Sequence, residues 1–364
     1  MKKARVSQLQ IARDLGVSQT LVSMVLNGRQ AGISEESYQN IWNHARRVGY
    51  RPKGMDPDVG GEQTAQTVGF VLRAGLTLHS QSNFFSHVQH GLHEFLSARG
   101  LALTFLGSEE RLDARQLKTA YSGANRLRGL VVMGEVKESF LHALRTLEPR
   151  VVSVSAQYSG LCHSVLSNEQ QTGEQIVEHL TGLGHRSFAW INGSRGMQRA
   201  RQRHQAVLNA LHLRDLPLDP RFSLEFDGAD RLEGHEAAHR LLTAAGKRHR
   251  PTAWICFNGL MARGAANGLL QNGVRIPQDV SLAAFDHTRI CMEERPALSA
   301  GGAEPESMGR IAGELVLQST GRADEAFSDT VLASEFTARE STGTPPAAGE
   351  PAARAGREGR SGRA

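Results

Sequence analysis

The chain has 364 residues and a formal net charge of +5, and its 40% apolar and 22% charged residues exclude wholesale disorder. No apolar stretch approaches the roughly 18 residues of a membrane-spanning helix, and the polar N-terminus lacks the apolar core of a secretory signal. Three widely spaced cysteines without a CxxC pair exclude a disulfide scaffold or a zinc finger, so the sequence predicts a protein of the reducing cytoplasm.

The positive charge is concentrated in residues 1–53, where nine Lys/Arg stand against three Asp/Glu, a net charge of +6. The rest of the chain has 33 Lys/Arg and 34 Asp/Glu, a net charge of −1. Such a distribution is typical of a small polyanion-binding head on a nearly neutral body.

Three amphipathic helices are predicted within residues 7–48. Ser7, Ser18 and Ser34 each stand where a hydroxyl can cap one of them, and Gly16 allows a tight turn after the first. The apolar stripes are, in order, Leu9, Ala12 and Leu15; Leu21, Val22, Val25 and Leu26; and Tyr38, Ile41, Trp42, Ala45 and Val48. Two short helices joined by a glycine turn and followed by a third predict a helix-turn-helix domain over residues 1–53.

Residues 54–66 lack a periodic apolar pattern and are predicted to form a linker. Across residues 67–340, short apolar runs alternate with amphipathic helical stretches; the runs cover 68–72, 101–106, 130–133, 151–154, 188–191, 253–257 and 280–285. This alternation predicts parallel, doubly wound sheets, and its length suits two lobes with a ligand cleft beyond the carboxyl ends of the strands. Residues 341–364, rich in Thr, Pro, Ala and Gly, are predicted to be a disordered tail.

The N-terminal segment from Val6 to Asn27 is VSQLQIARDLGVSQTLVSMVLN, and Ile33-Ser34 and Gly49-Tyr50-Arg51-Pro52 follow it. This pattern resembles the headpiece of the lactose-repressor/galactose-repressor (LacI/GalR) family. The body is similar to that family's sugar-binding core, notably in HLTGLGHR at 179–186 and IPQDVSLAAFD at 276–286. The resemblance covers about residues 5–340. It implies an all-α helix-turn-helix headpiece before an α/β, two-lobed, periplasmic-binding-protein-like core that binds an effector and dimerises.

The chain departs from the family pattern at several positions. Met24 stands where the family usually has a base-reading side chain, and residues 53–61 replace the usual hinge helix with an acidic, glycine-containing segment. Asn258-Gly259 replaces an Asn-Asp pair, so one carboxylate contact to a ligand is absent. Residues 301–303, Gly-Gly-Ala, replace a polar stretch.

The resemblance implies that the second helix of the head lies in the major groove of operator DNA. Gln19 can pair with adenine, Thr20 can contact a base edge or a thymine methyl, and Met24 offers only apolar contact. The side chains better placed for phosphates are Ser7, Ser18, Ser23, Asn27 and Arg29. The alternative to a DNA-binding head is an ordinary three-helix packing unit. Tyr38 and Trp42 are interpreted as core residues and not as residues that stack on bases.

In the body, Arg203 and Asp286 are predicted at strand-end loops, where they can bind sugar hydroxyls or a carboxylate. The alternative is an internal salt bridge across the cleft. Phe84 and Phe85 can form an apolar platform for a sugar face or can simply be core. The resemblance adds Asn83 and Asn258 to the predicted effector-binding set.

Fifteen histidines raise the question of a metal site, and His87, His90 and His93 share a helix face. No Cys or carboxylate set completes a site near them, so a solvated or cleft-facing surface is favoured and neither metal nor cofactor is predicted.

These observations predict a cytoplasmic, ligand-responsive transcriptional regulator, most often a repressor in this family. It is expected to bind a pseudo-palindromic operator in double-stranded DNA as a homodimer, or a higher oligomer, and to take a mono- or oligosaccharide between its lobes. The alternatives are a solute-binding receptor or an enzyme on the same core. A receptor needs an export signal and no DNA-binding head. An enzyme is not expected, because no nucleophile elbow, P-loop or dinucleotide fingerprint occurs.

Overall fold

The computed structural model describes residues 7–26, 33–48, 66–75, 83–112, 126–245, 250–293 and 295–347. The chain divides into two compact units, Met1–Glu62 and Gln63–Ala364. The atypical hinge at 53–61, Asn27, Arg29 and the side chain of Asn83 lie outside the described residues. Within the described ranges, no helix combines the length and apolar character needed to cross a bilayer.

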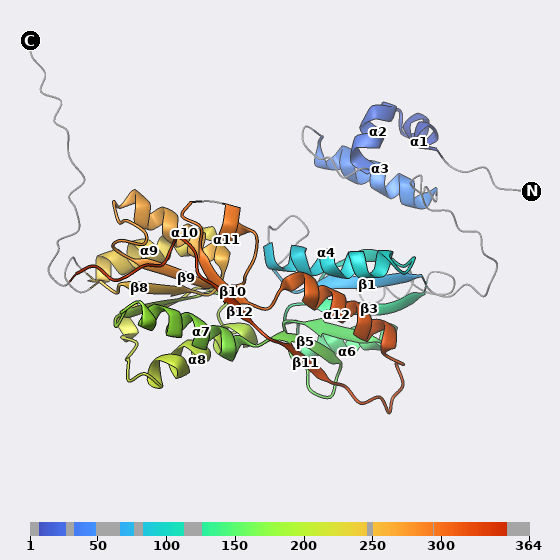
Figure 1. Ribbon diagram of the computed structural model, residues 1–364. Coiled ribbons are helices and arrows are strands. Elements are labelled where there is room, and N and C mark those ends of the chain that lie inside the picture. The colour runs from blue at the N-terminus through green and yellow to red at the C-terminus, as the bar shows by residue number, and fades with distance from the viewer. Residues whose placement is uncertain are drawn as a thin grey trace, which may run out of the picture. The chain divides into compact units, whose positions relative to one another are not determined.

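The first unit contains the three predicted helices, α1 (Gln8–Leu15), α2 (Gln19–Leu26) and α3 (Glu35–Arg47), shown in blue in Figure 1. The hydroxyls of Ser7, Ser18 and Ser34 accept hydrogen bonds from first-turn amides at 3.1, 3.1 and 3.3 Å, which confirms the predicted caps. Gly16 has φ +64°, the left-handed conformation that ends α1 and starts the turn.

The core of this unit consists of Ile11, Ala12, Val22, Val25, Ile41 and Ala45. Leu9 was expected in the apolar stripe but is 44% exposed, because α1 turns Ile11 and Ala12 toward the other helices. His44 of α3 contacts Asp14 of α1 at 3.0 Å, so a polar pair also ties the first helix to the third.

The second unit has two lobes, each built on a six-stranded sheet. The first lobe has strand order β11-β5-β4-β3-β1-β2, and all its strands are parallel. Its strands are β1 (Thr67–Leu72), β2 (Ala102–Ser108), β3 (Leu127–Met133), β4 (Val151–Val154), β5 (His163–Ser167) and β11 (Asp329–Leu332). Its helices are α4 (Asn83–Ser97), α6 (Glu138–Leu147) and α12 (Pro305–Gln318). Phe70 and Leu72 pack under α4 and α12, whereas Val71 packs under α6, so β1 is buried on both faces.

The second lobe has strand order β12-β10-β9-β8-β6-β7, parallel except for β12. Its strands are β6 (Phe188–Asn192), β7 (Ser223–Glu225), β8 (Ala253–Cys256), β9 (Ser281–Phe285), β10 (Ser299–Gly302) and β12 (Glu335–Thr337). Its helices are α7 (Glu169–Gly182), α8 (Gln198–His212), α9 (Arg231–Ala245), α10 (Gly259–Gln271), the short α11 (Ile290–Glu293) and a 3₁₀ turn (Pro220–Phe222). Helices α7 and α8 pair beneath this sheet in Figure 1, and α9 and α10 pair above it. The parallel two-lobed architecture confirms the predicted fold class.

The chain crosses between the lobes after β5, after β10 and after β11, so each lobe combines segments distant in sequence. Strands β5, β7, β10, β11 and β12 were not predicted. They are three to five residues long, and polar residues or glycines interrupt them, so they lack the long apolar runs expected of buried strands.

Residues 341–347, which the composition assigns to the predicted tail, belong to the described structure. The Ser341 carbonyl accepts from the amide of Leu282 at 2.8 Å, and its hydroxyl accepts from the amide of Ser299 at 2.8 Å. The amide of Gly343 donates to the Ser281 hydroxyl at 3.0 Å. Residues 341–343 thus bond to β9 and β10, a pairing that composition alone does not reveal.

Candidate functional site

The ends of the strands in the second unit carry an unusual set of backbone conformations. Ser155 follows β4, Ser194 lies two residues after β6, and Asp286 follows β9, and their φ angles are +63°, +52° and +68°. Among the described residues only one other non-glycine, Asp215 in a surface turn, has a positive φ. Left-handed non-glycine residues cost about 1–3 kcal/mol and tend to cluster at functional sites. These three residues therefore indicate a functional site at the ends of the strands.

A cavity of about 340 Å³ lies there, between the two lobes. The first lobe contributes Arg73, Gly75, Phe84, Phe85, Gly134, Glu135 and Ser155 to its lining. The second contributes Ser194, Met197, Arg199, Asp227, Gly228, Ala229, Asp230, Glu233, Phe257, Asn258, Leu260 and Asp286. Aromatic and aliphatic surface with a few convergent polar groups is the usual lining of a small-molecule site, and the volume lies within the usual range.

A cluster of four charged side chains supports one wall of this cavity. Arg203 bonds to Glu169 (Nε to Oε2, 2.9 Å), to Asp286 and to the Phe257 carbonyl. Arg199 bonds to the same two carboxylates, to Glu169 at 2.7 Å and to Asp286 at 2.6 Å. All four residues belong to the second lobe, so the cluster fixes α7, α8 and the end of β9 to one another.

Electrostatics keep two members of the cluster, Arg203 and Asp286, charged. Burial raises the pKa of the Asp286 carboxyl, but the guanidiniums of Arg199 and Arg203 outweigh burial and hold that pKa below its usual value. Burial lowers the pKa of Arg203, but Asp286 and Glu169 together shift it upward. Arg203 and Asp286 therefore form a charged pair at neutral pH.

This arrangement corrects the expected role of Arg203. Its side chain is 1% exposed and does not line the cavity, so it is placed to hold Asp286 rather than to touch a ligand. The alternative of an internal salt bridge describes Arg203 better, although the bridge lies within one lobe and not across the cleft. Asp286 does line the cavity, with both carboxylate oxygens bonded to arginines.

The two phenylalanines line the cavity, and Phe84 is also part of the core of the first lobe. Their rings meet edge to face at 5.2 Å. Across the cleft, the guanidinium of Arg199 lies 4.1 Å from the centre of the Phe84 ring, a cation–π contact. The core interpretation is therefore confirmed for Phe84, and its role as a platform for a sugar stays a prediction.

Asn258 lines the cavity and also caps α10. Its Oδ1 accepts from the amide of Met261 at 2.8 Å, and its Nδ2 donates to the carbonyl of Ala229 at 2.8 Å. Sequence reasoning missed Arg73, Glu135, Ser155, Ser194 and Arg199. The sequence contained a signal for Arg199, because it stands four residues before Arg203 and so lies on the same face of the helix.

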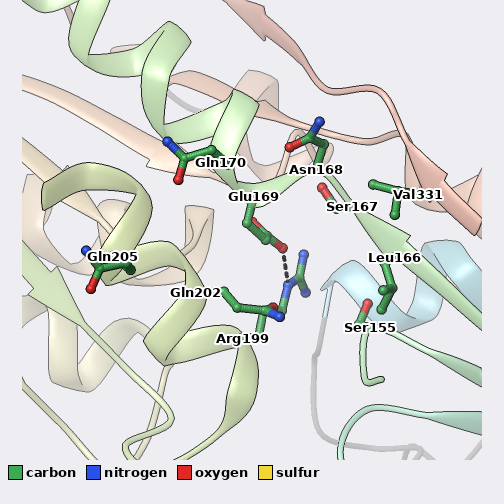
Figure 2. Close-up of a pocket in the computed structure, with 10 residues that line it drawn as sticks. All are labelled: Ser155, Leu166, Ser167, Asn168, Glu169, Gln170, Arg199, Gln202, Gln205 and Val331. Atoms are coloured by element: carbon green, nitrogen blue, oxygen red, sulfur yellow. Dashed lines mark hydrogen bonds and ion pairs between the residues drawn. The ribbon is translucent and has the colours of Figure 1, made fainter. Parts of the chain in front are cut away.

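A second pocket of about 330 Å³ lies where the chain crosses between the lobes (Figure 2). It is lined by Ser155, Leu166, Ser167, Asn168, Glu169, Gln170, Arg199, Gln202, Gln205 and Val331. Ser155 and Arg199 line both pockets, and Figure 2 shows the Arg199 side chain bonded to Glu169. The buried Ser155 hydroxyl has no hydrogen-bond partner within the described residues, and Ser155 lies at the boundary of the two pockets.

In the helix-turn-helix unit, Gln19 and Thr20 are exposed at the N-terminal end of α2, and Ser23 and Met24 are half-buried. The hydroxyls of Ser7 and Ser18 accept the capping bonds described above and each keeps its own proton for donation.

Each histidine of α4 contacts a different side chain: His87 contacts Glu306, His90 lies 3.5 Å from Glu94, and His93 lies 3.4 Å from the Ser97 hydroxyl. No group of three or more His, Cys, Asp or Glu side chains suited to a metal ion occurs in the described part of the chain.

The three cysteines are buried, and burial raises the pKa of Cys162 and of Cys291 to about 11.

Comparisons with known proteins agree with this geometry. Residues 177–342 match the family model "Periplasmic binding protein-like domain". The chain is 26% identical over 311 residues to the HTH-type transcriptional repressor PurR of Yersinia pestis bv. Antiqua (strain Antiqua), covering 84% of this chain and 88% of that one. It shares its fold with the transcriptional regulator CelR–cellobiose complex (TM-score 0.67, 21% identity, 93% and 100% of the two chains). It also shares it with the lac repressor dimer bound to operator and the anti-inducer ONPF (TM-score 0.65, 19% identity, 94% and 100%).

Proposed function

Because the chain belongs to the LacI/GalR family of transcriptional regulators, we propose that it binds operator DNA through its helix-turn-helix head and a small effector between the lobes of its core. The observation that carries this proposal is the cavity at the strand ends, lined from both lobes, in the same chain as a basic helix-turn-helix head. A ligand that contacts both lobes shifts the balance between their arrangements by its differential affinity, and linkage makes ligand and operator binding reciprocal.

The chemistry of the cavity favours a neutral, polyhydroxylated effector. The two guanidiniums that line the cavity already bond to groups of the protein, so they do not call for an anionic effector. Arg73 donates to the Ala74 carbonyl and the Ser194 hydroxyl, and Arg199 pairs with carboxylates. Carboxylates and a free hydroxyl suit sugar hydroxyls, and phenylalanine rings suit the apolar face of a sugar. Neighbouring structures are described with cellobiose and with ribose, and we infer a mono- or oligosaccharide for this chain as well.

For the effector site we retain Phe84, Phe85, Asn258 and Asp286 and add Arg199 and Ser155, with Arg203 as the support of Asp286. Asn83 stays a prediction. For DNA, the exposed Gln19 and Thr20 at the start of α2 are the proposed base readers. The remaining proposed contacts are Ser7, Ser18, Ser23, Met24, Asn27 and Arg29.

The proposal includes a homodimer on a pseudo-palindromic operator, because one helix-turn-helix buries too little surface for nanomolar affinity. It places the protein in the cytoplasm with the DNA. It keeps the domain boundaries 1–53 and 54–66, and it extends the core from 67–340 to 67–343, because residues 341–343 bond to β9 and β10. The curated relatives are named as repressors, and we propose no enzymatic activity.

The test has two arms on the purified full chain. Selection from a random duplex library is expected to enrich a pseudo-palindrome, which Gln19→Ala/Thr20→Ala should fail to enrich. A thermal-shift screen over mono- and disaccharides should then find a stabilising ligand. At one hundred times its dissociation constant it adds about 2.7 kcal/mol to the free energy of unfolding. Absence of any enriched sequence, or chemical turnover of the sugar, would overturn the proposal.

A further inference from the structure

Helix α8 begins against the opposite lobe. Its N-cap, Met197, makes no side-chain capping bond, and the first-turn amides of a helix have no partner within the helix. The amide of Gln198 instead donates to Oε2 of Glu135 at 2.5 Å. Glu135 follows β3 in the first lobe, so a carboxylate of one lobe caps the positive end of a helix in the other.

The side chain of Gln198 makes two further bonds across the cleft, both to the backbone of Gln157. The amide of Gln157 donates to Oε1 of Gln198, and Nε2 of Gln198 donates to the carbonyl of Gln157, each at 3.0 Å. Gln157 lies three residues after the end of β4, in the first lobe. One residue of the second lobe therefore makes three hydrogen bonds to two loops of the first.

Gln198 lines neither of the two pockets, so it can join the lobes without touching an effector. Its neighbours reinforce the contact: Arg73 of the first lobe donates to the Ser194 hydroxyl at 3.4 Å, and Arg199 lies over Phe84. We propose that Gln198 is a latch, a single side chain that holds the two lobes together, and that it thereby sets how strongly the chain binds its operator. The link to the operator rests on the proposed function, whereas the latch itself does not.

The latch is asymmetric in a way that makes it testable. Gln157 takes part through its backbone alone, because its side-chain Nε2 donates to Asp329 at 2.6 Å in the same lobe. Gln157→Ala therefore removes a glutamine side chain from the first-lobe side of this contact but leaves all three latch bonds in place. It is the matched control for Gln198→Ala. Gln198→Ala removes two of the three.

The first measurement is amide hydrogen exchange on the full chain, followed at positions 157 and 198. In Gln198→Ala the Gln157 amide loses its acceptor directly. The residue-198 amide keeps Glu135 as a possible acceptor, so it exchanges faster only if the lobes part. We expect roughly tenfold faster exchange at both positions, from two lost hydrogen bonds, and no change at residue 198 in Gln157→Ala. Gln198→Glu, which removes the Nε2 donor and adds a charge beside Glu135, should act in the same direction.

The second measurement is operator affinity without added small molecule, which should change severalfold in both Gln198 variants and not in Gln157→Ala. Wild-type exchange at residue 198 in both Gln198 variants overturns the latch. Faster exchange with unchanged operator affinity overturns its regulatory role. If wild-type protein binds no operator at all, the proposed function fails, and the exchange data still decide whether the latch exists.

Discussion

The guanidinium of Arg199 lies 4.1 Å from the centre of the Phe84 ring, so the first turn of α8 in one lobe contacts the first turn of α4 in the other. The same guanidinium bonds to Glu169 at 2.7 Å and to Asp286 at 2.6 Å. Arg199 thus contacts Phe84 on the first-lobe side of the cavity and the buried charge cluster on the second-lobe side. A molecule that enters the cavity meets this side chain, which makes Arg199 the best single probe of effector binding.

Arg199→Ala should weaken effector binding by at least about tenfold, because it removes the cation over Phe84 and leaves Asp286 with one arginine fewer. The measurement is a thermal-shift titration with a sugar found in the screen. Arg221→Ala is the control, because Arg221 pairs with Asp219 on the surface, away from both pockets. Equal affinities of wild type and Arg199→Ala would place the effector elsewhere.

Asp286→Asn should lower the free energy of unfolding by about 3 kcal/mol, because it leaves the buried Arg203 with a single carboxylate partner. Asparagine tolerates the left-handed backbone at this position, so the loss reports charge and not backbone strain. Urea unfolding measures it. Asp324→Asn, which breaks the exposed pair with Arg322, is the matched control and should leave the midpoint unchanged. A similar midpoint for the two variants would mean that the cluster contributes nothing to stability.

Acidification should destabilise the protein through His185. Both ring nitrogens lie 2.9 Å from partners, Thr252 on one side and Ser281 and the Gly343 carbonyl on the other. Burial lowers the pKa of this histidine below 6.5 in the folded chain, so the unfolded chain binds the proton first. The stabilisation is complete above about pH 6.5 and is lost as the pH falls below it, at up to about 1.4 kcal/mol per pH unit.

The check is urea unfolding of wild type and His185→Gln between pH 7.5 and 5.5. The variant should show the shallower dependence on pH. Part of the slope should persist, since burial also lowers the pKa of His179, His204 and His287. Identical slopes would show that His185 does not titrate differently on folding.

Gln19→Ala should cost about 1–3 kcal/mol of operator affinity at one base pair per half-site and relax the preference there. Arg29→Ala, a predicted phosphate contact, should instead weaken all duplexes equally and reduce the salt dependence of binding. Binding to a set of singly substituted operators distinguishes the two patterns. A uniform loss for Gln19→Ala would make Gln19 a backbone contact.

The sequence alone determined the features that depend on residues close together in the chain. Serine caps, the turn at Gly16 and the apolar spacing predict the three helices of the head, because hydrogen bonds and side-chain periodicity over three or four residues decide them. Alternating apolar runs predicted the parallel sheets, and strand-end position together with the family resemblance located Asn258 and Asp286 at the cavity. Phe84 and Phe85 were singled out as adjacent aromatic residues, and both line the cavity.

Only the tertiary structure decided which partners those residues take. Sequence reasoning left Arg203 with two interpretations, because Glu169 stands 34 residues before it and Asp286 stands 83 residues after it. The free energy of a buried charge depends on whether such distant carboxylates reach it, and chain spacing does not carry that information. Gln198 was missed for the same reason, because its three hydrogen bonds reach loops that stand 41 and 63 residues before it in the chain. Ser155 was missed because nothing in the sequence marks its left-handed backbone at the end of β4.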